Sequence, residues 1–358
     1  MNIETEYSST NNQTYLNTAS CGLISKSTLT AMQTYNERFM EHGSVVAEDW
    51  MMNKWESCRT TVADFFGAIV EQTALIPNFS FGYNAVLETV GPKKVLVYEN
   101  DYPSLLLPLQ LKGFELNTFT SSNNFDFDLN EIEDIIRKEN IELLVISHVQ
   151  FRTGYKANLE QLGNLCKKYN VIFIVDATQS AGAVSIDFNA LPIDALLFSN
   201  YKWLNAGMGT GTLLIKQSIL EQFEPKIGGF GSFIQENDSL VYKPSILSFQ
   251  PSHPNVPGCE ALKQAISEKQ DLGIKSIEKH NKDLLRQLII GLEEKEIPIF
   301  GAYHSDQRAG YVCLPFTEQQ FELLKKNRVI ATFRNNSLRI GPHFYNTSDH
   351  INRFLELV

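Results

Sequence analysis

Short apolar runs alternate with longer amphipathic stretches through the middle of the chain. The runs predict strands at residues 94–98, 115–119, 143–147 and 171–175, and stretches whose apolar positions recur every three or four residues predict helices at 104–112, 130–139 and 159–169. Because helix candidates separate the strand candidates, the pattern indicates a mainly parallel sheet with helices on both faces. We therefore expect an α/β fold.

The second half of the chain departs from this alternation. Residues 194–199 and 211–216 predict two strands whose connection is too short for a parallel crossover, so an antiparallel pair is expected. A proline-rich stretch at 244–258 precedes two predicted helices within 260–294, and from residue 297 the pattern predicts strand, strand, helix, strand and helix. We expect an N-terminal arm at 1–15, a large domain at 16–250, and interdomain helices with a small α+β domain at 251–358.

The composition narrows the class of protein. With 358 residues, of which 43% are hydrophobic, the chain can bury a large core, and its formal charge of −10 disfavours nucleic acid as a partner. No apolar run is long enough to cross a membrane, and the polar N-terminus lacks the features of a signal peptide. The five cysteines are scattered without C-x-x-C spacing, so neither a disulfide framework nor a zinc site is indicated. We expect a cytoplasmic protein that binds a small molecule and no metal.

Two candidate residues follow the predicted strands. Asp176 ends the apolar run that starts at residue 171, and so ends its strand, and Lys202 follows the strand candidate 194–199. Since ligands of open parallel sheets collect beyond the carboxyl ends of the strands, both side chains should face one crevice. Alone, the aspartate would suit a helix cap or a solvated turn, and the lysine would suit the surface. Together they suit pyridoxal phosphate, because a lysine can hold its aldehyde as a Schiff base while a carboxylate keeps its pyridine nitrogen protonated.

A phosphate group on such a cofactor would need hydrogen-bond donors. The N-terminus of a helix supplies them as unpaired backbone N–H groups, and the segment 78–85 has the features of a helix start. Ser80 could either cap this helix or contact the phosphate. Ser199, three residues before Lys202, is a second hydroxyl candidate that could also simply end its strand.

Six segments, taken in their order and spacing, resemble a known family. They are residues 15–20 (YLNTAS), 101–104 (DYPS), 147–154 (SHVQFRTG), 176–182 (DATQSAG), 202–204 (KWL) and 338–347 (LRIGPHFYNT). Over nearly its whole length the chain resembles the class V aminotransferases of the fold type I pyridoxal phosphate enzymes, and most of all their isopenicillin N epimerase-like and C–S lyase-like branches, which are related to cysteine desulfurases. The resemblance implies a mainly parallel sheet sandwiched by helices, a small C-terminal α+β domain, and a homodimer whose subunits complete each other's active sites.

The resemblance also implies roles for matching positions around the cofactor. Lys202 matches the lysine that forms the internal aldimine, and Asp176 matches the partner of the pyridine nitrogen. Gln179 matches a residue near the phenolic oxygen. Ser80 and the backbone of Phe79 match phosphate contacts.

Two further matching positions keep an alternative role. Tyr102 matches the place where the family puts a ring over the cofactor, although a core aromatic residue would also fit. Arg339 matches the arginine that binds the substrate's α-carboxylate, a task that suits the paired donors of a guanidinium. A surface salt bridge is the alternative for Arg339.

Departures from the family's motifs bear on the reaction. Many desulfurases have histidine before the lysine, where this chain has Tyr201, whose hydroxyl could still contact the phosphate or the cofactor. Relatives often show Gly-Thr-Pro near a subunit boundary, where this chain has His253 between a serine and a proline, so His253 would make the phosphate contact to the neighbouring subunit. Desulfurases also need a loop cysteine ahead of the arginine, and residues 328–339 contain none. Cys313 lies in an apolar run and Cys259 begins a helix, so persulfide chemistry is disfavoured.

The predicted chemistry is bond breaking at Cα or Cβ of an amino acid or related amine, with the released Lys202 as general base and acid. A class V aminotransferase-like reaction is the main expectation, and C–S lyase and epimerase reactions are alternatives. A non-catalytic cofactor-binding or regulatory protein could also keep Lys202 and Asp176, but Arg339 argues against it. A nucleotide-binding protein is disfavoured because no glycine-rich phosphate motif follows a strand. Substrate specificity is expected to come from residues 20–24 and 228–235.

Overall fold

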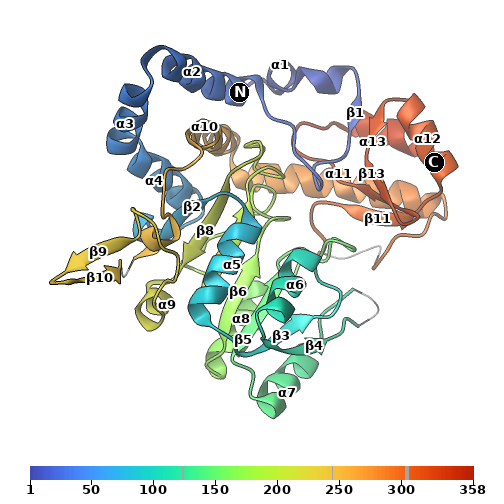
Figure 1. Ribbon diagram of the computed structural model, residues 1–358. Coiled ribbons are helices and arrows are strands. Elements are labelled where there is room, and N and C mark those ends of the chain that lie inside the picture. Colours follow the sequence, from blue (N-terminus) through green and yellow to red (C-terminus); the bar gives the residue numbers. More distant parts are fainter. Residues whose placement is uncertain (123–124, 244, 303–305) are drawn as a thin grey trace.

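A seven-stranded sheet with helices on both faces dominates the computed structural model, which describes residues 1–122, 125–243, 245–302 and 306–358 (Figure 1). In their order across the sheet, its strands are β2 (Thr73–Ile76), β8 (Gly211–Ile215), β7 (Ala195–Ser199), β6 (Ile172–Asp176), β5 (Leu143–Ser147), β3 (Lys94–Tyr98) and β4 (Glu115–Phe119). The pairs from β7 to β4 are parallel, and β8 is antiparallel to both of its neighbours. The predicted mainly parallel α/β fold is confirmed.

Two sets of helices cover the two faces of this sheet. The helices whose buried residues join the strand residues of the first face are α2 (Lys26–His42), α3 (Ser44–Asn53), α4 (Trp55–Phe65), α7 (Leu129–Glu139), α8 (Leu159–Lys168) and α10 (Val256–Leu272). The second face is covered by α5 (Phe79–Val90), α6 (Pro103–Leu111) and α9 (Gln217–Gln222). Because both faces are buried, the strands read as continuous apolar runs in the sequence.

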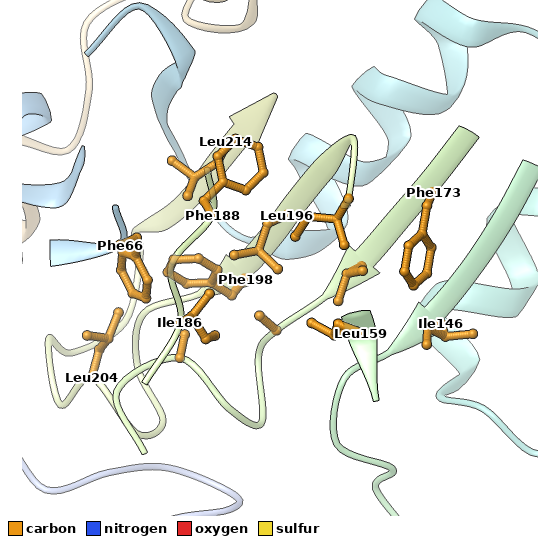
Figure 2. Packing of buried hydrophobic residues seen from close by; sticks show 14 of the residues in the cluster. Phe66, Ile146, Leu159, Phe173, Ile186, Phe188, Leu196, Phe198, Leu204 and Leu214 are labelled. Carbon is orange, nitrogen blue, oxygen red and sulfur yellow. The ribbon is translucent and has the colours of Figure 1, made fainter. Parts of the chain in front are cut away.

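The alternation of side chains along each strand supplies both faces of the core. In β7, Leu196 and Phe198 point to the first face, whereas Ala195 and Leu197 point to the second. Figure 2 shows the first face, where the ring of Phe198 lies 4.8 Å from the ring of Phe66, measured between centroids. These four residues of β7 are at most 1% exposed, so the strand that leads to Lys202 is fixed by packing on both sides.

A smaller sheet lies in the C-terminal part of the chain. Its strands, in spatial order, are β11 (Val312–Pro315), β14 (Ser337–Ile340) and β13 (Thr332–Arg334), and it packs with α11 (Ile274–Glu294), α12 (Glu318–Lys326) and α13 (Ser348–Leu355). The remaining elements are α1 (Ile3–Glu6), the pair β1 (Thr14–Tyr15) and β12 (Val329–Ile330), the hairpin β9 (Phe233–Glu236) and β10 (Ser239–Tyr242), and 3-10 turns at Ser8–Asn11, Val70–Gln72 and Ile246–Phe249. The predicted small α+β part at the C-terminus is confirmed.

The N-terminal segment connects this smaller sheet to the rest of the molecule. β1 pairs in parallel with β12, and Asn17 forms an isolated bridge with Gly341. Leu16 is fully buried in the same hydrophobic cluster as the C-terminal strands. The residues that follow, 18–24, therefore start from the C-terminal part and run toward the large sheet.

Most predicted elements occur at the expected places. The strands expected at 94–98, 115–119 and 143–147 match β3, β4 and β5, and the antiparallel pair expected from residues 194–216 is β7 with β8. Strand β6 begins one residue later than the expected start at residue 171, and Asp176 ends it as expected. Pro244, at the start of the proline-rich stretch, lies outside the described residues.

The order of elements predicted after residue 297 was partly wrong. No strand forms at 297–300, because the N–H of Ile297 bonds to the carbonyl of Leu292 and so ends α11. After α12, one predicted strand is replaced by β12, β13 and β14. The cause is a tight turn in which Asn335 and Asn336 both have positive φ (49° and 53°), the backbone geometry of a two-residue hairpin.

The structure bears on two expectations from composition, which concern membrane spans and the cysteines. In the described residues no helix is both long enough and apolar enough to span a membrane. All five cysteines are free thiols, and Cys58, Cys166, Cys259 and Cys313 are buried.

We expect Leu196→Ala to lower the free energy of unfolding by about 2–5 kcal/mol, because it would leave a cavity beneath the central strand β7. Leu196 is fully buried, whereas Leu111, at the end of α6, is 86% exposed. The matched change Leu111→Ala should therefore shift stability by less than about 0.5 kcal/mol. Urea unfolding followed by circular dichroism measures both, and equal midpoints for the two variants would contradict the packing described here.

Candidate active site

Polar side chains gather where three neighbouring strands of the large sheet end. Ser147 ends β5, Asp176 ends β6 and Ser199 ends β7, and Ser147 pairs directly with Asp176 in the sheet. A cavity of about 410 Å3 lies at this edge and is lined by Asn78, Phe79, Ser80, Tyr102, Ser104, Ser147, Val149, Phe151, Asp176, Thr178, Gln179, Ser199, Tyr201 and Lys202. The structure therefore brings together Asp176, Lys202 and the other residues expected around the cofactor, with the exception of His253.

Asp176 is a buried carboxylate at the base of this cavity. It is 6% exposed and accepts a hydrogen bond of 2.8 Å from the backbone N–H of Thr178. Burial raises its pKa to about 6, against the opposing effects of the Thr178 hydrogen bonds and of the positive charge on Lys202. This burial differs from the solvated turn that would have been the ordinary alternative for an aspartate at a strand end.

Lys202 is buried as well, in contrast to an ordinary surface lysine. Its side chain is 8% exposed, and its Nζ lies 5.8 Å from the ring centroids of both Tyr102 and Tyr201. Burial, and after it the positive charge of Arg339, lowers the pKa of Lys202 to about 8, while Asp176 acts in the opposite direction. At pH 7 a pKa of about 8 leaves roughly a tenth of this amine unprotonated, far more than for an ordinary lysine, and that fraction can act as nucleophile or base.

Two glycines let other parts of the chain approach the Lys202 segment closely. A Cβ on Gly22 would lie 2.0 Å from the carbonyl oxygen of Lys202, and the N–H of Gly22 donates to the carbonyl of Tyr201 at 2.9 Å. Gly182, with φ of +94°, would place a Cβ 2.5 Å from the carbonyl oxygen of Trp203. Glycine at both positions allows the backbone to be held from two sides.

Two buried side chains that the sequence analysis missed also hold this segment. His343 Nε2 donates to the carbonyl of Trp203 at 2.9 Å, and Lys269 Nζ donates to the carbonyl of Leu204 at 2.8 Å. Both side chains are fully buried, and both also contact Asn205 Oδ1, at 3.1 and 2.9 Å. Burial lowers the pKa of Lys269 to about 7. Their contacts join distant parts of the sequence, so local patterns carried no signal for them.

The start of α5 forms one end of the cavity. Asn78 caps this helix, because its side chain accepts from the N–H of Phe81 at 2.9 Å, so Ser80 is not the cap. The N–H of Phe79 donates to Ser199 Oγ at 3.0 Å, which means that Ser199 does more than end its strand. Ser80 is exposed toward the cavity, and its N–H has no hydrogen-bond partner among the described residues.

Gln179 is held in place from both ends of its amide. Its Nε2 donates to the carbonyl of Ala19 at 3.0 Å, and its Oε1 accepts from the indole N–H of Trp203 at 2.9 Å. The amide is therefore oriented by the N-terminal segment and by the residue after Lys202.

Tyr102 and His253 lie in different surroundings. Tyr102 lines the cavity, is 41% exposed and makes an edge contact with Phe151 at 5.3 Å between ring centroids, so it is not a core residue. His253 is exposed and lines a separate cavity of about 180 Å3, together with Phe81 of α5. Within one chain, His253 does not join the residues around Lys202.

A second cavity of about 530 Å3 adjoins the first. The two share Tyr102, Phe151, Tyr201 and Lys202. The second is further lined by Ala19, Ser20, Pro103, Arg152, Phe300, Cys313, Thr332, Arg334, Asn335, Ser337 and Arg339. Ser20 belongs to the expected specificity loop 20–24, whereas none of residues 228–235 lines either cavity.

Arg339 projects from β14 into the second cavity. Its Nη2 donates to Ser20 Oγ at 2.7 Å, its guanidinium lies 5.5 Å from the ring centroid of Tyr311, and its buried Nε has no hydrogen-bond partner in the described part of the chain. No ion pair to Arg339 occurs among the described residues, so a surface salt bridge does not account for it. A carboxylate would satisfy these free donors.

Cys313 also lines the second cavity, which the sequence pattern did not predict. It pairs with Arg339 across β11 and β14 and is 5% exposed. Burial raises the pKa of its thiol to about 11, although Arg339 acts to lower it. The thiol is therefore mostly protonated at neutral pH and is a weak nucleophile.

Several features of the first cavity fit pyridoxal phosphate. The cavity volume falls within the roughly 300–1,000 Å3 range of small-molecule sites. The first turn of α5 offers N–H groups and hydroxyls for a phosphate. At the other end Asp176 is buried without an ion-pair partner among the described residues, which suits a protonated ring nitrogen. Lys202 would hold the aldehyde.

Comparison with known proteins identifies the family. Residues 14–354 match the family model of the class V aminotransferases. A probable cysteine desulfurase of Pyrococcus abyssi is 30% identical, over 95% of this chain and 92% of its own length. The apo structure of a cysteine desulfurase from Thermococcus onnurineus superposes with a TM-score of 0.90 at 24% identity, covering 99% of this chain and 96% of that chain. A kynureninase of Bacillus cereus is 25% identical, over 99% of this chain and 90% of its own length.

Two substitutions should shift the pKa of Lys202 in opposite directions in cofactor-free protein. Asp176→Asn removes a negative charge that stabilises the ammonium, so it should lower the pKa below the value of about 8. Arg339→Gln removes a positive charge that destabilises the ammonium, so it should raise the pKa. The rate of acetic anhydride labelling against pH, read by mass spectrometry, gives the midpoint for each lysine.

Lys26, exposed at the start of α2, serves as the internal control, and its labelling should be the same in all three proteins. A shift of Lys202 in the same direction in both variants, or no shift in either, would show that these charges do not act on the amine as described.

Proposed function

We propose that this chain, which belongs to the class V aminotransferase family, is a pyridoxal phosphate-dependent enzyme that moves a proton at Cα of an amino acid and transfers its amino group. Membership of the family confirms the resemblance and the cofactor predicted from the sequence. The observation that carries the proposal is the position of Lys202. Its buried amine lines both the cofactor cavity and the adjoining cavity that contains Arg339.

The residues of the first cavity would hold the cofactor by its polar groups. Ser80, Ser199 and the backbone at Phe79 would hold the phosphate, and Asp176 would hold the ring nitrogen. Gln179, oriented by Trp203 and Ala19, would donate to the ring oxygen through its second amide hydrogen. When bound, pyridoxal phosphate supplies an aldehyde carbon for an amine and an electron-accepting ring that stabilises negative charge on the neighbouring carbon.

Arg339 would bind the substrate's α-carboxylate. Its Nε lacks a partner among the described residues and its Nη2 contacts a hydroxyl, so the guanidinium can accept a carboxylate without losing an ion pair. Ser20 would orient it, since the Ser20 hydroxyl also lies 2.5 Å from Thr332 Oγ1. The substrate's Cα would then lie near Lys202, because that lysine lines both cavities.

Lys202 would move the proton. With a pKa near 8 its amine is close to the value at which a group can both accept and return a proton at neutral pH. The carbonyls of the segment from Tyr201 to Leu204 are held by Gly22, His343 and Lys269, which fixes the base of the side chain while the amine moves. Return of the proton to the cofactor gives transamination, and return to Cα from the other side gives epimerisation.

Desulfuration of cysteine is a second candidate because a relative covering nearly the whole chain is named a probable cysteine desulfurase. Within the described lining of the two cavities, Cys313 is the one thiol that could take up sulfur. Its raised pKa of about 11 and its burial weigh against that role. Residues 328–339, which lead to Arg339, contain no cysteine.

We expect Lys202→Ala to lower turnover about 100- to 10,000-fold, because it removes the general base. Purified wild-type protein should show visible absorption from the cofactor, and borohydride reduction should attach the cofactor to the Lys202 peptide. Borohydride should attach no cofactor to the protein in Lys202→Ala, and any bound cofactor should absorb at a different wavelength because no bond to the lysine can form, whereas Lys26→Ala should behave like wild type.

A panel of amino acids, with assays for keto acid, pyruvate, racemisation and sulfide, then distinguishes the reactions. Sulfide release from cysteine that is lost in Cys313→Ser would establish the second candidate instead. If no amino acid alters the absorption of the wild-type cofactor, the enzyme proposal fails and a binding or regulatory protein remains.

We further propose that the chain acts as a homodimer in the cytoplasm. Large apolar side chains are exposed on α2 and α3, among them Met40 at 79% and Met52 at 82%, and Phe230 ahead of the β9–β10 hairpin is 93% exposed. Surfaces of this kind commonly mark an interface. The hairpin projects from the body of the subunit (Figure 1), where it could reach a second copy. Five free thiols suit a reducing compartment.

The role proposed for His253 can be tested by subunit mixing. If His253 contacts the phosphate of the partner subunit, Lys202→Ala and His253→Ala homodimers should each be impaired. A hybrid dimer of the two variants would contain one site with both substitutions and one intact site, so mixing should restore activity. If His253 acts within its own subunit, or has no role, the hybrid will contain no site better than those of its parents. Sedimentation velocity on wild type should show a dimer.

A further inference from the structure

The hairpin that carries Arg339 presents a polar face to the substrate cavity. Thr332 pairs with Arg339, and Arg334 pairs with Ser337, across β13 and β14. Residues two apart along a strand point to the same side, so these four side chains share one face. All four line the second cavity.

The other face of the same hairpin is buried. Phe333 and Leu338, which form the pair between the two polar pairs, belong to the hydrophobic cluster of the C-terminal part. The turn of Asn335 and Asn336 is tight, because both residues adopt left-handed backbone geometry. A shift of register by one residue would bury the polar face, so the position of Arg334 beside the cavity is fixed by the same alternation that fixes Arg339.

Arg334 and Arg339 are diagonal neighbours on this face. In an antiparallel pair, diagonal positions lie about 7–8 Å apart, a separation that long side chains can bridge toward one small ligand. Two positive side chains on neighbouring positions repel each other, and the repulsion is relieved when an anion binds between them.

A third arginine comes from the loop after β5. Arg152 lines the same cavity as Cys313, the residue paired with Arg339, and its charge weakly opposes the rise that burial causes in the pKa of that thiol. None of the described residues that line this cavity is an aspartate or a glutamate. No ion pair involving Arg152 or Arg334 is found in the described part of the chain.

We propose that the substrate is an amino acid whose side chain carries a second anionic group, and that Arg334, with Arg152, forms the subsite for that group. The inference rests on the proposed function, in which Arg339 binds the α-carboxylate. One guanidinium suffices for a single carboxylate, and Arg334 and Arg152, which line the same cavity and are exposed to solvent, add positive charge that an anionic side chain of the substrate would balance. Carboxylate, sulfinate and phosphate share the chemistry that a guanidinium recognises.

The first test compares acidic amino acids with neutral ones of the same shape. The holoenzyme is assayed with aspartate against asparagine and with glutamate against glutamine. We expect the acidic member of at least one pair to have the higher kcat/KM by about tenfold or more, since hydrogen bonds between charged groups are stronger than those to a neutral amide. Cysteine sulfinate and O-phosphoserine then distinguish which anion the subsite prefers.

The second test changes the charge at the subsite. In Arg334→Gln the preference for the acidic over the neutral substrate should fall about 10- to 100-fold, mainly through a higher KM. The matched control is Arg328→Gln, an exposed arginine before β12 that lines neither cavity. That variant should keep the wild-type preference. Arg152→Gln should reduce the preference in the same direction as Arg334→Gln.

The outcomes separate this inference from the proposed function. If no amino acid of either kind changes the absorption of the cofactor, the proposed function itself fails. If neutral amino acids react as well as or better than their acidic counterparts, or if Arg334→Gln changes both members of a pair equally, the enzyme stands and the anionic subsite is wrong.

Discussion

The burial of the Lys202 amine is the constraint on which the active site depends. An ammonium group loses hydration when it is buried, and that loss lowers its pKa to about 8 and makes it reactive near neutral pH. Asp176, buried at the end of the neighbouring strand, acts in the opposite direction, and its own pKa is raised to about 6. Both side chains therefore lie in a site from which solvent is largely excluded. Strands β6 and β7, neighbours in the sheet and packed on both faces, bring Asp176 and Lys202 to the same edge of the sheet.

The site also requires parts of the chain that are far apart in sequence. Residues 14–17 are attached to the C-terminal strands, and the following residues cross to the Lys202 segment, where Gly22 contacts the carbonyl of Tyr201. Arg339 is brought to the same place by β14 and is held by Ser20 of the crossing segment. This arrangement puts the charge of Arg339 close enough to lower the pKa of Lys202, so a substrate carboxylate that neutralises Arg339 would also change the basicity of the amine. Binding of a substrate carboxylate at Arg339 would thus be coupled to the pKa of the Lys202 amine.

The sequence predicted the large sheet well because its signal is local. Short strand patterns bounded by helix patterns identified β3, β4 and β5 with their bounds, and the ends of the strands located Asp176 and Lys202. The contacts of Lys269 and His343 could not be predicted, since each joins segments more than sixty positions apart. The C-terminal order was partly wrong because the pair Asn335–Asn336 forms a hairpin turn, and that turn was read as part of one strand. With a turn at Asn335–Asn336, Arg334 and Arg339 fall on the same face of the hairpin.

The charge of the substrate cavity differs in sign from that of the whole protein. The chain has 41 acidic and 31 basic residues, yet the described lining of this cavity contains Arg152, Arg334, Arg339 and Lys202 and no acidic residue. A concave surface with walls of low dielectric constant concentrates such a field, so anions are drawn inward against the negative charge of the rest of the surface. Under the proposed role of this cavity, such a distribution of charge would favour small anionic ligands even before any specific contact with Arg339 is made.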